Sequence, residues 1–168
     1  PMEYSPGLRG VVAGETAIST VGKEGTSLRY RGYDAIELTK NNTYEEVASL
    51  IIKDSLDGDE FKEAFSKHYN NKAFKDETLS KYIENLKSMH PSREMHPMAL
   101  LRTIVSGGEE MESDTEIESI ARISATVCFA IASYHKADTN ILSDKYLVAS
   151  SLLPNDANDE MLEALDDM

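Results

Sequence analysis

Two of the four histidines in the chain, His90 and His96, lie close together among Met89, Met95 and Met98. Imidazole and thioether groups at short spacing are possible metal ligands. A structural zinc site, however, needs a complete tetrahedral set of nitrogen or sulfur ligands, and no second cluster supplies the rest. We therefore interpret the pair as one loop histidine and one histidine at a helix start, and the sequence predicts no metal site.

The other two histidines also have structural interpretations. His68 falls on an apolar helical stripe, which favours a partly buried ring that makes a hydrogen bond. His135 lies beside Lys136 at the expected end of the longest helix, where positive charge is favourable. Neither residue is predicted to bind a metal or to act in catalysis.

Two arginines, Arg29 and Arg31, flank Tyr30 on an expected strand, so both side chains should lie on one face of it. The guanidinium fork suits both carboxylates and phosphates. The pair could therefore anchor a substrate carboxylate or a coenzyme phosphate. A structural salt bridge is the favoured interpretation, and the residues that bind any coenzyme stay unknown.

The only cysteine is Cys128, so the chain can form no internal disulfide. It lies in an apolar run at 127–132, which favours a buried, inert thiol over a nucleophile. The sequence also shows no motif for nucleotide phosphates, no Ser/His/Asp order and no recognisable carboxylate pair. We therefore assign no catalytic residue.

Length and charge limit the class of protein. The chain has 168 residues and a formal net charge of -13 at pH 7. That length suits one compact domain, and an acidic protein is repelled by nucleic acid and by anionic membrane surfaces. No leader-like segment opens the chain, and no apolar run approaches the ~20 residues that cross a bilayer. We expect a cytoplasmic protein, or the mature form of an organellar one, with neither nucleic acid nor membrane as partner.

The expected fold is mainly α, with a small N-terminal β hairpin. Glycines and β-branched residues predict strands at 17–21 and 28–30 around a turn at 22–25. Capping boxes at 43–46 and 113–116 mark two helix starts, and periodicity and punctuation give the others. One expected helix begins at residue 43. The others cover residues 57–70, 77–86, 96–106, 115–136 and 158–167. The acidic residues of the last segment should form a solvated face: Asp156, Asp159, Glu160, Glu163, Asp166 and Asp167.

The longest expected helix lacks a polar face over most of its length. One apolar stripe runs from Ile117 to Tyr134, and Ile123 and Phe129 lie on the other side. An amphipathic surface helix keeps one polar face. This helix must therefore be covered on more than one side, by its own domain or by another chain.

The order and spacing of several segments resemble the citrate synthase family. The opening segment 7–19 is similar to the motif G-L-x-G-V-x-A-x-E-T-x-I-S, and 28–33 is identical to L-R-Y-R-G-Y. Residues 96–106 are similar to H-P-M-x-x-L-R-T-x-V-S. Further similar segments lie at 43–50, 120–127, 146–154 and 163–166. Three turns or kinks depart from the family pattern, at 54–57, at Ser124 or Ala125, and before Pro154.

The resemblance implies the helical large domain of an enzyme that condenses acetyl-CoA or propionyl-CoA with oxaloacetate in the tricarboxylic acid cycle. It divides the chain into strands and hairpin at 1–33 and an incomplete helical domain at 34–168, which stops before the family's catalytic histidines. The chain is then a scaffold, without bound cofactor or activity of its own. It also implies a homodimer through the helices near 96–107 and 115–136, or pairing with the C-terminal part of the enzyme. The alternative is a self-standing helical interaction or regulatory protein derived from the enzyme.

Overall fold

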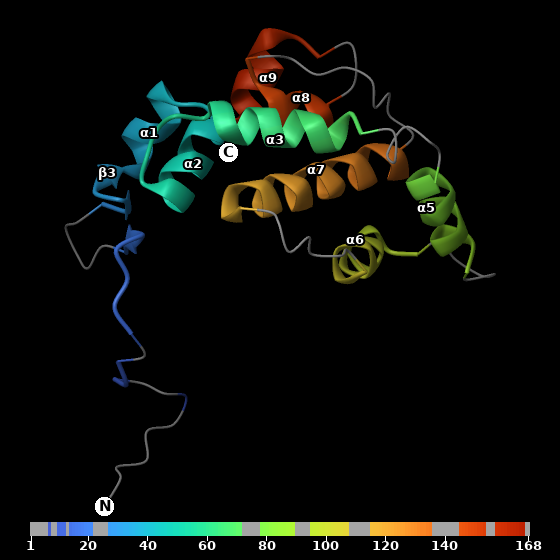
Figure 1. The fold of residues 1–168 in the computed structure, drawn as a ribbon, viewed down its shortest axis with the longest axis horizontal. Helices are drawn as coiled ribbons and strands as arrows, with labels where there is room; N and C mark the ends of the chain where they lie inside the picture. Colours follow the sequence, from blue (N-terminus) through green and yellow to red (C-terminus); the bar gives the residue numbers. More distant parts are fainter. Residues whose placement is uncertain are drawn as a thin grey trace, which may run out of the picture.

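The computed structural model describes residues 7, 10–12, 14–21, 27–71, 78–89, 95–107, 115–135, 145–153 and 157–166. Short strands and helices follow one another along the chain, and residues 10–12 and 14–18 extend away from the helices (Figure 1). A mainly α fold with a small N-terminal sheet is therefore confirmed. The expected turn at 22–25 lies outside the described residues.

The sheet has one strand more than the expected hairpin. Strands β1 (Ser19–Thr20), β2 (Arg29–Tyr30) and β3 (Tyr33–Asp34) pair antiparallel in that order. The chain reverses between β2 and β3 with positive φ at Arg31 (48°) and Gly32 (90°). Because this turn is tight, the chain pairs again directly after it and forms a third strand where the hairpin was expected to end.

The helices have the following bounds (Figure 1): α1 Ala35–Asn41, α2 Tyr44–Lys53, α3 Asp59–Tyr69, α5 Thr78–Ser88, α6 Pro97–Ser106, α7 Glu116–Tyr134, α8 Leu147–Leu152 and α9 Asp159–Asp166. Every expected helix is present within a few residues of its predicted ends. The short helix α8 was not expected, because six residues carry too little periodicity to reveal a helix.

The start of α7 differs from the sequence prediction. The capping box was expected at 113–116, but the N-cap is Thr115, whose hydroxyl accepts from the backbone N of Glu118 at 3.3 Å. The Glu118 carboxylate in turn accepts from the backbone N of Thr115 at 2.8 Å. Both segments fit the capping-box pattern. The structure uses the second one, which places the buried Ile117 in the first turn.

The main core lies between α3 and α7, which run side by side (Figure 1). Phe61, Phe65 and Tyr69 stack along α3 at four-residue spacing, and Tyr69 meets Phe129 of α7 edge to face. Helices α2, α5, α6 and α8 contact α7 as well. The expectation that α7 is covered on more than one side is therefore confirmed.

Two smaller clusters complete the interior. Ile83 and Leu86 of α5 pack with Leu100 and Ile104 of α6 and with Ala130 of α7. The other cluster joins α8 to α9 through Tyr146, Ala149 and Leu162. Among the described helices, α7 alone is long and apolar enough to cross a bilayer, a property that the core helix of a globular fold shares.

Candidate functional interface

Helix α6 is positioned by its first turn and by its buried side. The His96 Nδ1 atom accepts from the backbone N of Met98 at 3.2 Å, so this histidine is the N-cap, and Pro97 occupies the first turn. The expectation of a helix-start histidine is confirmed. Leu100 and Ile104 then point into the core, with 1% and 5% of their surfaces exposed.

The opposite side of α6 remains apolar and exposed. Met98 and Val105 expose 65% and 43% of their surfaces, and Leu101 between them is half-buried. These residues follow one another at three- and four-residue spacing, so they form one stripe. Leu101 packs partly against the cluster of α5, α6 and α7, whereas Met98 and Val105 stay exposed among the described residues.

Helix α7 carries a matching stripe. Ile120 and Ile123 expose 40% and 42% of their surfaces, and Val127 and Ile131 are half-buried. The spacing is again three or four residues. We refer to the two stripes together as the α6–α7 face; its members are Met98, Leu101, Val105, Ile120, Ile123, Val127 and Ile131.

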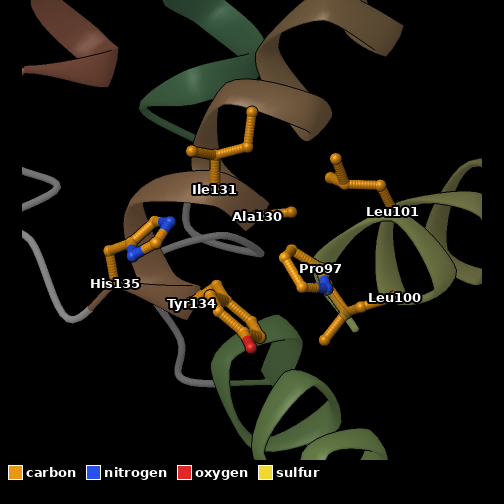
Figure 2. A pocket seen from close by; sticks show the side chains of 7 residues that line it. All are labelled: Pro97, Leu100, Leu101, Ala130, Ile131, Tyr134 and His135. Carbon is orange, nitrogen blue, oxygen red and sulfur yellow. The ribbon is translucent and has the colours of Figure 1, made fainter. Parts of the chain in front are cut away.

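The two stripes meet at a small apolar pocket. Figure 2 shows Pro97, Leu100 and Leu101 of α6 facing Ala130, Ile131, Tyr134 and His135 at the end of α7. Its volume is about 20 Å³, which is room for little more than one water molecule. Pockets for small ligands measure about 300–1,000 Å³. The pocket is therefore far too small for a coenzyme.

The C-terminal end of α7 is held by α5 and by the segment before α6. The Tyr134 hydroxyl donates to the Met95 carbonyl at 3.2 Å, and Lys87 Nζ donates to the Tyr134 carbonyl at 3.3 Å. His135 is the C-cap, and its ring lies edge to face against Tyr134. The expected position of His135 at the helix end is confirmed, and no sequence signal pointed to Lys87.

The remaining histidines give no metal centre among the described residues. His68 is half-buried in the last turn of α3, and it has an interaction partner, as its place on the stripe predicted. His90 lies outside the described residues, so its pairing with His96 stays untested. Within the described ranges, no group of three or more His, Cys, Asp or Glu side chains could hold a metal ion.

The two arginines do not share a face of one strand. Arg29 lies in β2, but Arg31 follows it in the left-handed turn. The Arg29 side chain donates to the Gly32 carbonyl at 3.3 Å, and Arg31 donates to the Ile51 carbonyl of α2 at 2.9 Å. Among the described residues, neither arginine forms the expected salt bridge within 4.0 Å, although Arg29 interacts electrostatically with Asp34.

Cys128 is buried in the main core, with 5% of its surface exposed. Burial raises the pKa of its thiol, since a thiolate is poorly solvated there. The prediction of a buried thiol is therefore confirmed.

From the sequence, one carboxylate, Asp166, was assigned wrongly and another, Glu45, was missed. Asp166 is half-buried and accepts from the backbone N of Tyr44 at 3.1 Å, so it is not part of a solvated face. Glu45 of α2 is fully buried. Its spacing to Ser49 and Ile52, which also pack inward, was the signal that could have found it.

Comparison with known proteins identifies the family. The model of the family described as "Citrate synthase, C-terminal domain" matches residues 7–165. The 2-methylcitrate synthase of Shewanella oneidensis is 34% identical over 127 residues, which cover 76% of this chain and 32% of that protein. The citrate/2-methylcitrate synthase of Bacillus subtilis is 33% identical over 103 residues, covering 61% and 26%. The citrate synthase of Haloferax volcanii is 28% identical over 158 residues, covering 86% and 41%.

The aligned part thus spans between 26% and 41% of the length of these relatives. The family match nevertheless covers nearly all of this chain, and the helical fold agrees with what the opening and central motifs imply. The chain belongs to the citrate synthase family.

Proposed function

We propose that this chain is the N-terminal segment of a citrate synthase-type enzyme. The complete enzyme condenses acetyl-CoA or propionyl-CoA with oxaloacetate to citrate or methylcitrate, in the cytoplasm and within the tricarboxylic acid cycle. The similarity to proteins named citrate synthase and 2-methylcitrate synthase supports the reaction class. The catalytic histidines and carboxylate of such an enzyme would come from outside this chain.

Within that enzyme, the chain serves as scaffold and dimer interface. The observation that carries this role is the α6–α7 face, where Ile120 and Ile123 each leave about two-fifths of their surfaces exposed. Closed two-fold dimers use the same patch twice. Each exposed isoleucine would then be buried in both copies, and burial of its remaining two-fifths contributes that share of the ~1.5–3 kcal/mol that full burial supplies.

Sedimentation of the purified chain tests the interface. We expect a dimer, and Ile123→Glu should shift the chain to monomer, because the new carboxylate would be buried without a partner. Ile36→Glu is the matched control, since Ile36 exposes 61% of its surface on α1, outside the α6–α7 face. A parent chain that is monomeric at all concentrations would contradict the dimer interface.

A second experiment tests the enzyme assignment. The chain alone, mixed with acetyl-CoA or propionyl-CoA and oxaloacetate, should release no free CoA. A chimera that carries this chain in place of the aligned segment of the Shewanella oneidensis relative should condense propionyl-CoA with oxaloacetate. A chimera that is dimeric and helical but inactive would contradict the proposal, and so would activity of the chain alone.

A further inference from the structure

Glu45 makes a contact that joins distant parts of the chain. It is in the first turn of α2, its surface is 0% exposed, and its Oε1 accepts from the backbone N of Val148 at 2.9 Å. Val148 is in the first turn of α8, where backbone N–H groups lack partners within the helix. A carboxylate satisfies such a donor strongly, because the bond is charge-assisted. The six-residue helix α8 therefore depends on α2 for the order of its first turn.

Asp166 makes a second contact between a carboxylate and a helix start, in which α9 provides the carboxylate and α2 provides the backbone N. It is in the last turn of α9, and its Oδ2 accepts from the backbone N of Tyr44, the first residue of α2. A carboxylate at the C-terminal end of a helix is unfavourable for that helix, but it is favourable at the N-terminal end of another. The position of Asp166 is therefore explained by α2 and not by α9 itself.

The two contacts act on one packing unit. Helices α8 and α9 share a small cluster of their own, in which Leu162 of α9 packs against Ala149 of α8. Tyr146, which precedes α8, completes it. Among the described elements, α9 packs mainly on α8. Two carboxylates thus join the α8–α9 pair to α2: the buried Glu45 of α2 and Asp166 of α9.

We propose that Glu45 and Asp166 form a two-carboxylate latch, which holds the α8–α9 pair against the first turn of α2.

The latch is tested by a distance measurement on this chain. Spin labels are attached through Lys67→Cys on α3 and Ala164→Cys on α9, both exposed positions. Cys128 is 5% exposed and stays unlabelled in the folded chain. We expect a narrow distribution of distances in the parent, a broad one in Asp166→Ala, and a narrow one again in Asp166→Asn, because asparagine keeps an acceptor oxygen. Glu163→Ala is the control, since it removes an exposed carboxylate from the same helix.

Amide hydrogen exchange gives an independent readout. Asp166→Ala should accelerate exchange across 159–166 by about tenfold or more, the effect of losing one charge-assisted hydrogen bond, and leave α3 and α7 unchanged. Glu45→Gln should preserve protection of the Val148 amide, whereas Glu45→Ala should lose it; if Glu45→Ala does not fold, the Asp166 variants decide.

An Asp166→Ala chain as narrow in distance as the parent overturns the proposal, as does an asparagine variant no better than alanine. These measurements involve no substrate, so a failed latch leaves the proposed enzyme standing. An inactive chimera likewise leaves the latch standing.

Discussion

Lys87 of α5 holds the C-terminal end of α7 through a single residue, Tyr134. Its Nζ atom lies 4.7 Å from the centre of the Tyr134 ring and 3.3 Å from the Tyr134 carbonyl oxygen. The Lys87 side chain is only 11% exposed, and its ion pair with Glu84 at 3.6 Å keeps it in place. A cation near the last carbonyls of a helix interacts favourably with the helix dipole. The contact therefore joins α5 to the pocket end of the α6–α7 face.

Lys87→Met should lower the free energy of unfolding by about 1–2 kcal/mol, because a partly buried cation at a helix C-terminus contributes in this range. Methionine keeps most of the side-chain packing and removes the charge. The measurement is urea denaturation followed by circular dichroism. Lys40→Met is the control, since the Lys40 side chain is 63% exposed and its ion pair with Glu37 is on the surface. Its effect should stay below about 0.5 kcal/mol, and equal losses in both variants would contradict the cap.

Two glycines with nearly the same backbone should respond in opposite ways to alanine. Gly58 and Gly107 have φ of -83° and -88°, which any residue adopts. A Cβ on Gly58 would lie 3.1 Å from the Glu46 backbone N and 3.2 Å from the Glu45 carbonyl carbon. Gly58→Ala should therefore destabilise the chain by about 1–3 kcal/mol, the usual effect of overpacking.

At Gly107 the nearest atom to an added Cβ is the Thr103 carbonyl oxygen at 3.4 Å, an ordinary contact distance. Gly107→Ala should be neutral or should stabilise by about 0.4–1 kcal/mol, since it restricts the unfolded chain. Thermal unfolding of the two variants side by side measures the contrast. Destabilisation of both by the same amount would show that the space around Gly58 is not the cause.

Asp54 occupies a backbone conformation that usually belongs to glycine. It ends α2 with φ 58° and ψ 35°, and its backbone N donates to the Leu50 carbonyl at 3.0 Å. Glycine adopts this left-handed conformation without strain. Asp54→Gly should therefore stabilise the chain by roughly 0.5–1 kcal/mol. Asp54→Val should destabilise it, because a β-branched residue fits the left-handed region poorly, and a melting temperature that moves the other way in either variant would contradict this explanation.

The sequence predicted best what depends on local chemistry. The N-cap role of His96, the start of α6 at Pro97 and the position of His135 follow from rules that involve only neighbouring residues. The apolar character of α7 was also visible, because a nineteen-residue helix repeats its pattern several times. The assignment of its sides was partly wrong, since Ile123 was placed opposite Ile120 and the structure exposes both. The pairing of α6 with α7 in one interface, by contrast, was implied by the family resemblance and not by periodicity.

Contacts between distant segments could not be predicted. The burial of Glu45 and the half-burial of Asp166 depend on helices that lie 103 and 122 residues away along the chain. Helix α8 also depends on a distant segment, because the backbone N of Val148 in its first turn donates to Glu45. Arg31 was expected on the strand, but Arg31 itself has a positive φ and lies in the turn. A positive φ is rarely predictable outside glycine.

The buried thiol of Cys128 should make stability depend on pH above neutrality. Burial raises the pKa of Cys128 in the folded chain, whereas in the unfolded chain the thiol titrates near its ordinary value of about 8.5. The folded state therefore holds the proton more tightly, so stability is fully present below that value and falls as the pH rises above it. The slope should approach about 1.4 kcal/mol per pH unit while only the unfolded state titrates.

Urea denaturation at several pH values between about 8 and 9 measures this slope, about one unit below the ordinary pKa values of tyrosine and lysine. Cys128→Ala should be less stable at neutral pH, because it leaves a small cavity in the main core, but it should lose most of the slope. An exposed cysteine introduced by Met161→Cys on α9 is the control, since Met161 is 47% exposed and should add no slope. A slope that persists unchanged in Cys128→Ala would assign the pH dependence to another group.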